Sequence, residues 1–159
     1  MAGFEVSESV ARLLGFRHIF ESAQFCSGSN AAIVRGIKEM SLGAVKKQAG
    51  PSSLGVVAEL DSRIEESALR YLAERGKLLV VNASSLTFAR PGQLPMLIRR
   101  ARWLYLHSVH AGLQISVATF AASKQALLSA AQLLRVAALL GAEPSDAKHM
   151  LERLGSLVV

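Results

Sequence analysis

The stretch Ala73-Glu-Arg-Gly-Lys-Leu-Leu-Val-Val-Asn82 indicates the fold class, because Gly76 separates the end of a helical pattern from a short apolar run. Before it, residues 54–60 are typical of a strand, and Asp61 is a residue type that caps helices, so we expect a helix over 61–75. After it, residues 77–82 form the next predicted strand. Strand, helix and strand in this order predict a βαβ unit with parallel strands.

The same alternation continues toward the C-terminus, where Gly112 and Gly141 end two further helical patterns. The predicted elements are a helix over 94–111, a strand over 113–119, a helix from Ser123 to residue 140, and a last helix over 146–154. In the first fifty residues, helices are expected over 9–14 and 30–40, and strands over 16–20 and 44–47.

These elements predict a single α/β domain over residues 1–159, with five or six parallel strands. A complete eight-stranded (β/α) barrel typically needs about 200 residues or more. The chain has 159 residues, so we expect an open parallel sheet or an incomplete TIM-like (β/α) barrel.

The charges are distributed unevenly along the chain. Eighteen Lys and Arg outnumber twelve Asp and Glu, which gives a net charge of +6 and favours polyanionic partners. No carboxylate occurs between Glu74 and Glu143. That interval contains Arg75, Lys77, Arg90, Arg99, Arg100, Arg102, Lys124 and Arg135. Either this segment is simply a buried one, which needs few charges, or it carries a basic functional surface.

A reducing compartment suits the single cysteine, Cys26, which has no intramolecular partner for a disulfide. The N-terminus lacks a basic region followed by an apolar run, so no secretory signal is expected. The longest uncharged stretch, 103–123, is interrupted by His107, His110 and other polar residues. We therefore expect a cytoplasmic protein with no membrane partner.

The carboxyl ends of the predicted strands, where parallel α/β folds place their reactive groups, are chemically sparse. They offer Glu59, Asp61, Asn82, Ser84, Ser85 and Thr119. The four histidines are scattered, and no nucleophile elbow or phosphate-binding glycine loop occurs. We therefore predict no catalytic residue, no metal ligands and no cofactor bound by the protein. The alternative is a metal-dependent phosphoesterase-like hydrolase with ligands from Glu59, Asp61, His107 and His110.

The predicted helix 94–111 has two contrasting faces. Its apolar stripe, formed by Leu94, Leu97, Ala101 and Leu104, is expected to pack on the sheet. The opposite face carries Arg99, Trp103, Leu106 and His110, flanked by Arg100 and Arg102. Arginines beside an aromatic ring are typical of a surface that binds RNA or a protein, unless another helix of the domain covers Trp103.

The next predicted helix, over 123–140, is apolar on nearly all sides. Such a helix must be covered on more than one side, either within the domain or by a protein partner or second copy.

In the order of these features, residues 54–154 resemble the ribonuclease P protein component 3 family of archaea and eukaryotes. The similar features are the unit ending in Asn82, the arginine-rich helix with Arg99-Arg-Ala-Arg102, the segment Thr119-Phe-Ala121 where the family has Ser-Gly-Ala, and a helix ending Leu139-Leu-Gly141. The chain differs at Leu128-Ser-Ala130, where the family has Arg-Ser-Pro.

The resemblance implies an incomplete (β/α) barrel that acts as a non-catalytic subunit. The RNA of the assembly removes the 5′ leader of precursor tRNA with Mg²⁺, and a small ferredoxin-like protein subunit pairs with this one. By position, Arg90, Arg99, Arg100, Arg102 and Lys124 are expected to contact RNA, while Trp103, Leu106 and His110 are expected to contact a partner. A structural scaffold without RNA affinity is a further alternative.

Overall fold

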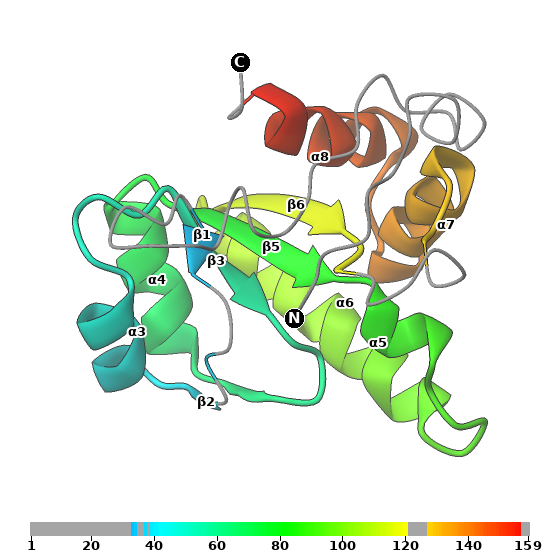
Figure 1. Cartoon of the computed structure of the whole chain (residues 1–159), viewed down its shortest axis with the longest axis horizontal. Helices are drawn as coiled ribbons and strands as arrows, with labels where there is room; N and C mark the ends of the chain where they lie inside the picture. Colours follow the sequence, from blue (N-terminus) through cyan, green and yellow to red (C-terminus); the bar gives the residue numbers. More distant parts are fainter. Residues whose placement is uncertain (1–32, 35–36, 38, 121–126, 157–159) are drawn as a thin grey trace, which may run out of the picture.

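The computed structural model of the chain describes residues 33–34, 37, 39–120 and 127–156. Its main sheet has four strands in the order β1 (Ile33–Val34), β3 (Gly55–Ala58), β5 (Leu78–Asn82) and β6 (Gln114–Ala118), as Figure 1 shows. All neighbouring strands are parallel. The predicted α/β class and the parallel strand pairing are therefore confirmed.

The strands of this sheet lie side by side in the order in which the chain forms them. Because parallel crossovers are almost always right-handed, consecutive neighbours place their helices on the same face of the sheet. Those crossovers contain α3 (Leu42–Gln48), α4 (Glu66–Glu74), α5 (Ser84–Thr87) and α6 (Leu94–His110). After β6 the chain forms α7 (Ala130–Leu140) and α8 (Pro144–Ser156).

Two short strands lie outside the main sheet. β2 (Glu39–Met40) and β4 (Arg63–Ile64) pair in parallel as a separate two-stranded sheet. β1 and β6 are at opposite ends of the main strand order, so the described part of the chain forms an open sheet. The described residues thus contain six strands, four in one sheet and two in the other. Of these, β3, β5 and β6 were expected as strands, whereas β1, β2 and β4 were not.

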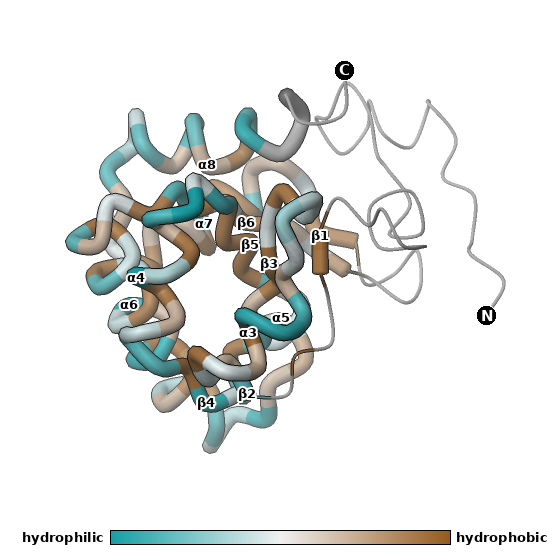
Figure 2. Tube along the Cα trace, turned by 90° about the vertical axis from the view of Figure 1, so that its left-hand side faces the viewer, coloured by the Kyte–Doolittle hydropathy of each residue, from teal (hydrophilic) through white to brown (hydrophobic). Residues whose placement is uncertain are grey.

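The hydrophobic core is larger on one face of the main sheet than on the other. Alternate residues of a strand point to opposite faces, and Val56, Leu79 and Ile115 belong to the larger cluster with residues of α4, α6 and α7. Val57 and Val80 belong to a smaller cluster on the other face. In Figure 2 the strands at the centre are hydrophobic, and the helices around them carry both hydrophobic and hydrophilic residues.

The outer edge of β6 is covered by α8, which runs above it in Figure 1. Arg153 donates from a terminal guanidinium nitrogen to the Ile115 carbonyl oxygen at 3.2 Å, and the Ser116 hydroxyl donates to the Met150 carbonyl oxygen. These bonds fasten α8 to β6, and the helix thereby protects the strand edge from pairing with another chain.

Lys77 is buried, although it belongs to the basic segment of the sequence. Its Nζ donates to the carbonyl oxygens of Gly50 at 3.0 Å, Pro51 at 3.1 Å and Ser53. Burial lowers the pKa of Lys77, and the positive charge of Arg75 lowers it further. Lys77 therefore fixes the loop before β3 and adds nothing to a basic surface.

Several predicted boundaries are wrong. Asp61 does not cap a helix: α4 begins at Glu66, after the short strand β4. Residues 44–47 lie in α3 and form no strand. The segment 30–40 contains strands β1 and β2, so a helix over it is wrong for its described residues. The helix ending at Leu140 starts after Ser129, whose hydroxyl accepts from the Gln132 amide.

The remaining predictions at the N-terminus lie outside the described residues: the helix over 9–14, the strand over 16–20 and Cys26. Ser123, expected to cap a helix, also lies outside them. By contrast, Gly76, Gly112 and Gly141 follow helices as predicted and have positive φ angles of 62°, 70° and 101°. Among the described helices, none has the length and apolar character needed to cross a membrane.

Candidate nucleic-acid interface

Helix α6 presents the predicted mixed face to solvent. Arg99, Trp103, Leu106 and His110 are all exposed, with 37% of Trp103 and 54% of Leu106 accessible. Leu97, Ala101 and Leu104 are buried on the opposite face, as the spacing predicts. The prediction that Leu94 belongs to the same buried stripe is wrong, because Leu94 lies in the first turn of α6 and is exposed. The described part of the chain therefore does not cover Trp103 completely.

Two of the three arginines on α6 are tied to backbone carbonyls of other elements. Arg100 donates from a terminal nitrogen to the Asp61 carbonyl oxygen at 3.2 Å, and Arg102 donates from Nε to the Leu139 carbonyl oxygen at 2.8 Å. A carbonyl oxygen orients a guanidinium group without cancelling its charge. Since each guanidinium has five N–H donors, most of them remain available to a phosphate group.

Three basic residues outside the acid-free segment have a carboxylate close by, whereas the arginines of α6 do not. Arg63, Arg70 and Lys148 each lie within 4.0 Å of a carboxylate oxygen, on Glu39, Glu66 and Glu152 respectively. In the described residues, Arg99, Arg100 and Arg102 have no such ion pair. The positive charge on α6 is therefore not neutralised by the described part of the protein itself.

A chain of contacts links Trp103 to α4. The indole of Trp103 stacks on the His107 imidazole, with ring centroids 4.3 Å apart and an interplanar angle of 30°. His107 Nδ1 lies 3.6 Å from Glu66 Oε2. The other Glu66 oxygen accepts from Arg70 at 2.6 Å, and this bond and charge lower the pKa of Glu66. The rotamer of Trp103 is thus supported by two residues of α4 through His107.

Two open hollows flank the arginines. One, of about 330 Å³, is lined by Leu60, Ser62, Arg63, Ile64, Arg100 and Trp103. The other, of about 560 Å³, is lined by Pro91, Leu94, Pro95, Ile98, Arg99 and Arg102. The structure therefore divides the predicted arginine cluster: Arg100 belongs to the side that faces β4, and Arg99 and Arg102 belong to the side nearer α7.

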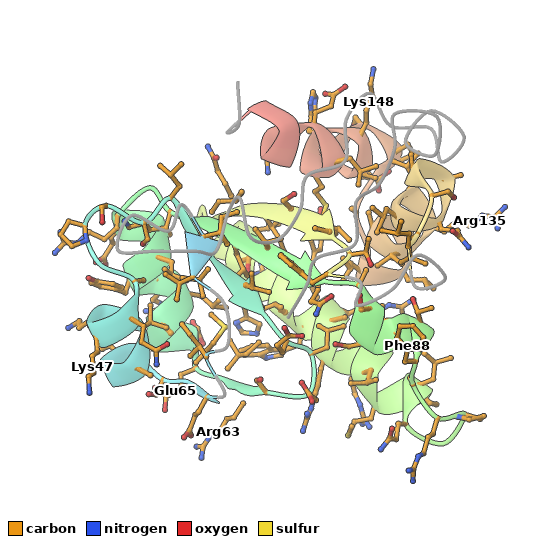
Figure 3. All side chains as sticks on the ribbon, viewed as in Figure 1. Lys47, Arg63, Glu65, Phe88, Arg135 and Lys148 are labelled. Atoms are coloured by element: carbon orange, nitrogen blue, oxygen red, sulfur yellow. The ribbon has the colours of Figure 1, made fainter. Side chains whose placement is uncertain are left out.

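The other two residues predicted to contact RNA, Arg90 and Lys124, lie outside α6. Arg90 is exposed in the loop before α6, where its carbonyl oxygen accepts from the amides of Gln93 at 2.8 Å and Leu94 at 3.3 Å. Lys124 lies outside the described residues. Arg135, a basic residue of the same acid-free segment, projects outward from α7 in Figure 3.

The carboxyl ends of β3, β5 and β6 bring a small polar cluster together. Asn82 is buried, and its Nδ2 donates to Glu59 Oε2 at 2.7 Å while its Oδ1 accepts from the Ser84 amide at 3.0 Å. The hydroxyls of Ser84 and Thr119 lie 3.0 Å apart. Asn82 thereby links the residue that follows β3 to the end of β5. Across the described residues, no three His, Cys, Asp or Glu side chains are close enough to share a metal ion.

Large apolar side chains are also exposed on α6 and α7. Besides Leu106, Val109 is 52% exposed, and Leu134 and Leu139 of α7 are 38% and 43% exposed. The helix that the sequence predicts to be covered on several sides is covered on one, through Leu133, Val136, Ala137 and Leu140. The exposed residues leave two neighbouring helices with apolar surface beside the arginines.

Sequence reasoning missed Ser62 and Arg63, which line the hollow beside Trp103. Both fall in the helix predicted to begin at Asp61, whereas the structure places Ser62 in a turn and Arg63 in β4. The pairing of Arg63 with Glu39 across β4 and β2 is non-local, so the spacing of the sequence gives no signal for it.

The chain matches no known family model, and no curated protein is significantly similar to it.

Proposed function

We propose that this chain is a non-catalytic, RNA-binding protein subunit of ribonuclease P, which supports the catalytic RNA in removing the 5′ leader from precursor tRNA. The observation that carries the proposal is the exposed face of α6, where Arg99, Arg100 and Arg102 lack carboxylate partners in the described residues. Guanidinium groups that are not neutralised bind phosphates and release their counterions. The resemblance of residues 54–154 to protein component 3 supplies the assignment to ribonuclease P.

The finer architecture in this proposal is an incomplete TIM-like (β/α) barrel. The consecutive strand order β1-β3-β5-β6 supports it, because a (β/α) barrel also adds each strand next to the previous one. The proposal places the protein in the cytoplasm, with no membrane partner. It assigns any Mg²⁺ to the RNA and none to this chain.

The proposed protein partner is the small ferredoxin-like subunit of the same assembly. Leu106 and His110 of α6 are the residues proposed to meet it, and the exposed Val109, Leu134 and Leu139 extend that surface. Exposed apolar side chains at this density support a protein contact, since they would lose contact with water when a partner covers them.

RNA binding is tested with matched triple variants of the full chain. Arg99→Ala, Arg100→Ala and Arg102→Ala together remove three charges from α6. The control, Lys46→Ala, Lys47→Ala and Lys148→Ala, removes three exposed charges from α3 and α8. Affinity for a structured RNA is measured over a range of salt concentrations. We expect the α6 variant to flatten the slope of log K against log salt by about 2–3 units, and the control to retain the wild-type slope. Binding that does not respond to salt would contradict the proposal.

The assembly is tested by tagging the native protein, purifying it at moderate salt and sequencing the RNA that accompanies it. We expect ribonuclease P RNA and cleavage of precursor tRNA in the purified material. Absence of any enriched RNA would instead favour the scaffold alternative. Stoichiometric bound metal, lost together with a hydrolytic activity in a Glu59→Gln variant, would favour the phosphoesterase-like alternative.

A further inference from the structure

A hollow between α6 and the segment that joins β3 to β4 combines three kinds of chemistry in about 330 Å³. Leu60, which is fully buried, and Ile64 provide apolar surface, Trp103 provides an aromatic ring, and Ser62, Arg63 and Arg100 provide hydrogen-bond donors. Sites for small ligands have volumes of about 300–1,000 Å³. The hollow is therefore of a size for one small planar group rather than for a double helix.

The aromatic wall of this hollow is held in place from one side. His107 stacks on Trp103 at 4.3 Å, and His107 follows Trp103 by one helical turn. Arg100 precedes Trp103 by about one turn, and both residues line the hollow, which His107 does not. We take the indole face that is turned away from His107 as the surface on which a second planar ring would stack.

Two cations of the hollow come from different elements. Arg100 is oriented by the Asp61 carbonyl oxygen at 3.2 Å, and its other N–H groups are not bonded to described residues. Arg63 has a side chain that is 78% exposed, and it lies 3.9 Å from Glu39, beyond the length of a hydrogen bond. Figure 3 shows Arg63 projecting into solvent at the lower edge of the molecule. Arg100 can therefore turn toward an anion directly, and Arg63 can do so by exchanging its long contact with Glu39 for one with the anion.

We propose that this hollow binds one unpaired nucleotide of RNA, with its base stacked on Trp103 and its phosphate held by Arg100 and Arg63. The inference rests on the proposed RNA-binding function and adds to it a preference for a single-stranded nucleotide at one place. It also assigns Trp103 to RNA rather than to the protein partner. Every nucleobase has a π-face, so the site accepts any base, and the paired bases of a duplex cannot enter it.

Trp103 is the only tryptophan of the chain, so its fluorescence reports on the hollow alone. The full chain is titrated with a short single-stranded oligoadenylate and, separately, with an RNA duplex. We expect saturable quenching by the oligoadenylate and binding of the duplex without quenching, since the remaining α6 arginines contact its backbone. Quenching to the same extent by both RNAs would overturn the nucleotide site.

Variants outside the α6 arginines separate this site from general RNA binding. Trp103→Leu keeps apolar volume and loses the stacking surface, so its affinity for labelled oligoadenylate should fall by about 5- to 100-fold, whereas Trp103→Phe should lose much less. Neither change should alter duplex affinity. If Trp103→Leu binds oligoadenylate as the wild type does, the nucleotide site is refuted.

The phosphate contact is tested with Arg63→Ala and a matched control. Lys148 has an equivalent ion pair, 3.8 Å from Glu152, and projects from α8 at the opposite edge of the molecule in Figure 3. Arg63→Ala should weaken oligoadenylate binding several-fold, and Lys148→Ala should not.

The outcomes for this site and for the proposed function are distinguishable. Duplex binding that depends on the α6 arginines, with no quenching by oligoadenylate, refutes the nucleotide site and leaves RNA binding in place. Failure of both RNAs to bind refutes both proposals.

Discussion

Arg102 Nε donates a hydrogen bond of 2.8 Å to the carbonyl oxygen of Leu139, which lies in the last turn of α7. The last four carbonyls of a helix have no partner within it, and a cation near them interacts favourably with the helix dipole. Arg102 therefore has a structural role in joining α6 to α7, in addition to the RNA contact proposed for it.

Because Arg102 has both roles, Arg102→Ala and Arg99→Ala should differ in their effect on stability and agree in their effect on RNA binding. Arg102→Ala should lower the free energy of unfolding by about 1 kcal/mol, because α7 loses a bond and a charge at its C-terminus. Arg99→Ala, on the same helix, should change it by less than about 0.5 kcal/mol. Both variants should weaken RNA binding. Urea denaturation and an RNA titration make the comparison, and equal stability of the two variants would contradict the role of Arg102.

At the start of β3, the backbone of the neighbouring strand leaves no room for a side chain at Gly55. A Cβ atom there would collide with the Leu78 carbonyl oxygen of the neighbouring strand and lie 3.1 Å from the Leu78 Cβ. Gly55→Ala should therefore lower the free energy of unfolding by about 2–3 kcal/mol. The matched control is Gly43→Ala in α3, where a Cβ would meet nothing within 4 Å. It should stabilise the protein by about 0.5–1 kcal/mol, since alanine favours a helix. Thermal unfolding of both variants would show whether the two changes have opposite signs.

The fold was predictable where its signals are local. The apolar runs of β3, β5 and β6 are each continuous in the sequence, and the glycines after α4, α6 and α7 closely follow the helices that they end; the structure confirms both. The start of α4 was not predictable in the same way. Residues 63–64 pair with 39–40 through β4 and β2, so a contact distant in sequence replaces the first turn of the expected helix.

The same distinction applies to the candidate site. The exposed face of α6 follows from the helical period, so Arg99, Trp103, Leu106 and His110 could be placed together in advance. The partners that orient Arg100 and Arg102 could not, because both are backbone carbonyls, and any residue type supplies one. The sequence therefore predicts that the arginines of α6 are exposed and leaves open which of them are held in place.

Two buried serines should respond in opposite directions to the same substitution. Both are completely buried, but the Ser108 hydroxyl has no hydrogen-bond partner among the described residues, whereas the Ser116 hydroxyl donates to the Met150 carbonyl oxygen. Ser108→Ala removes a polar group that is buried without compensation and should raise the free energy of unfolding by about 1 kcal/mol. Ser116→Ala removes the hydrogen bond that joins β6 to α8 and should lower the free energy of unfolding by about 1 kcal/mol. Chemical denaturation of the two variants is the measurement, and a loss of stability in Ser108→Ala would show that its hydroxyl is satisfied.

Tyr105 predicts how stability changes at alkaline pH. Burial raises the pKa of its phenol above the ordinary value of 10.0, and the carboxylates of Asp146 and Glu143 raise the pKa further. Above pH 10.0 the folded state therefore keeps a proton that the unfolded state has lost, so this contribution to stability is complete below that pH and is lost as the pH rises through the folded pKa. The chain has two tyrosines, and Tyr71→Phe leaves Tyr105 as the only one. In that variant the absorbance change of tyrosine ionisation should have its midpoint above pH 10.0, and a midpoint at or below that value would contradict the burial of Tyr105.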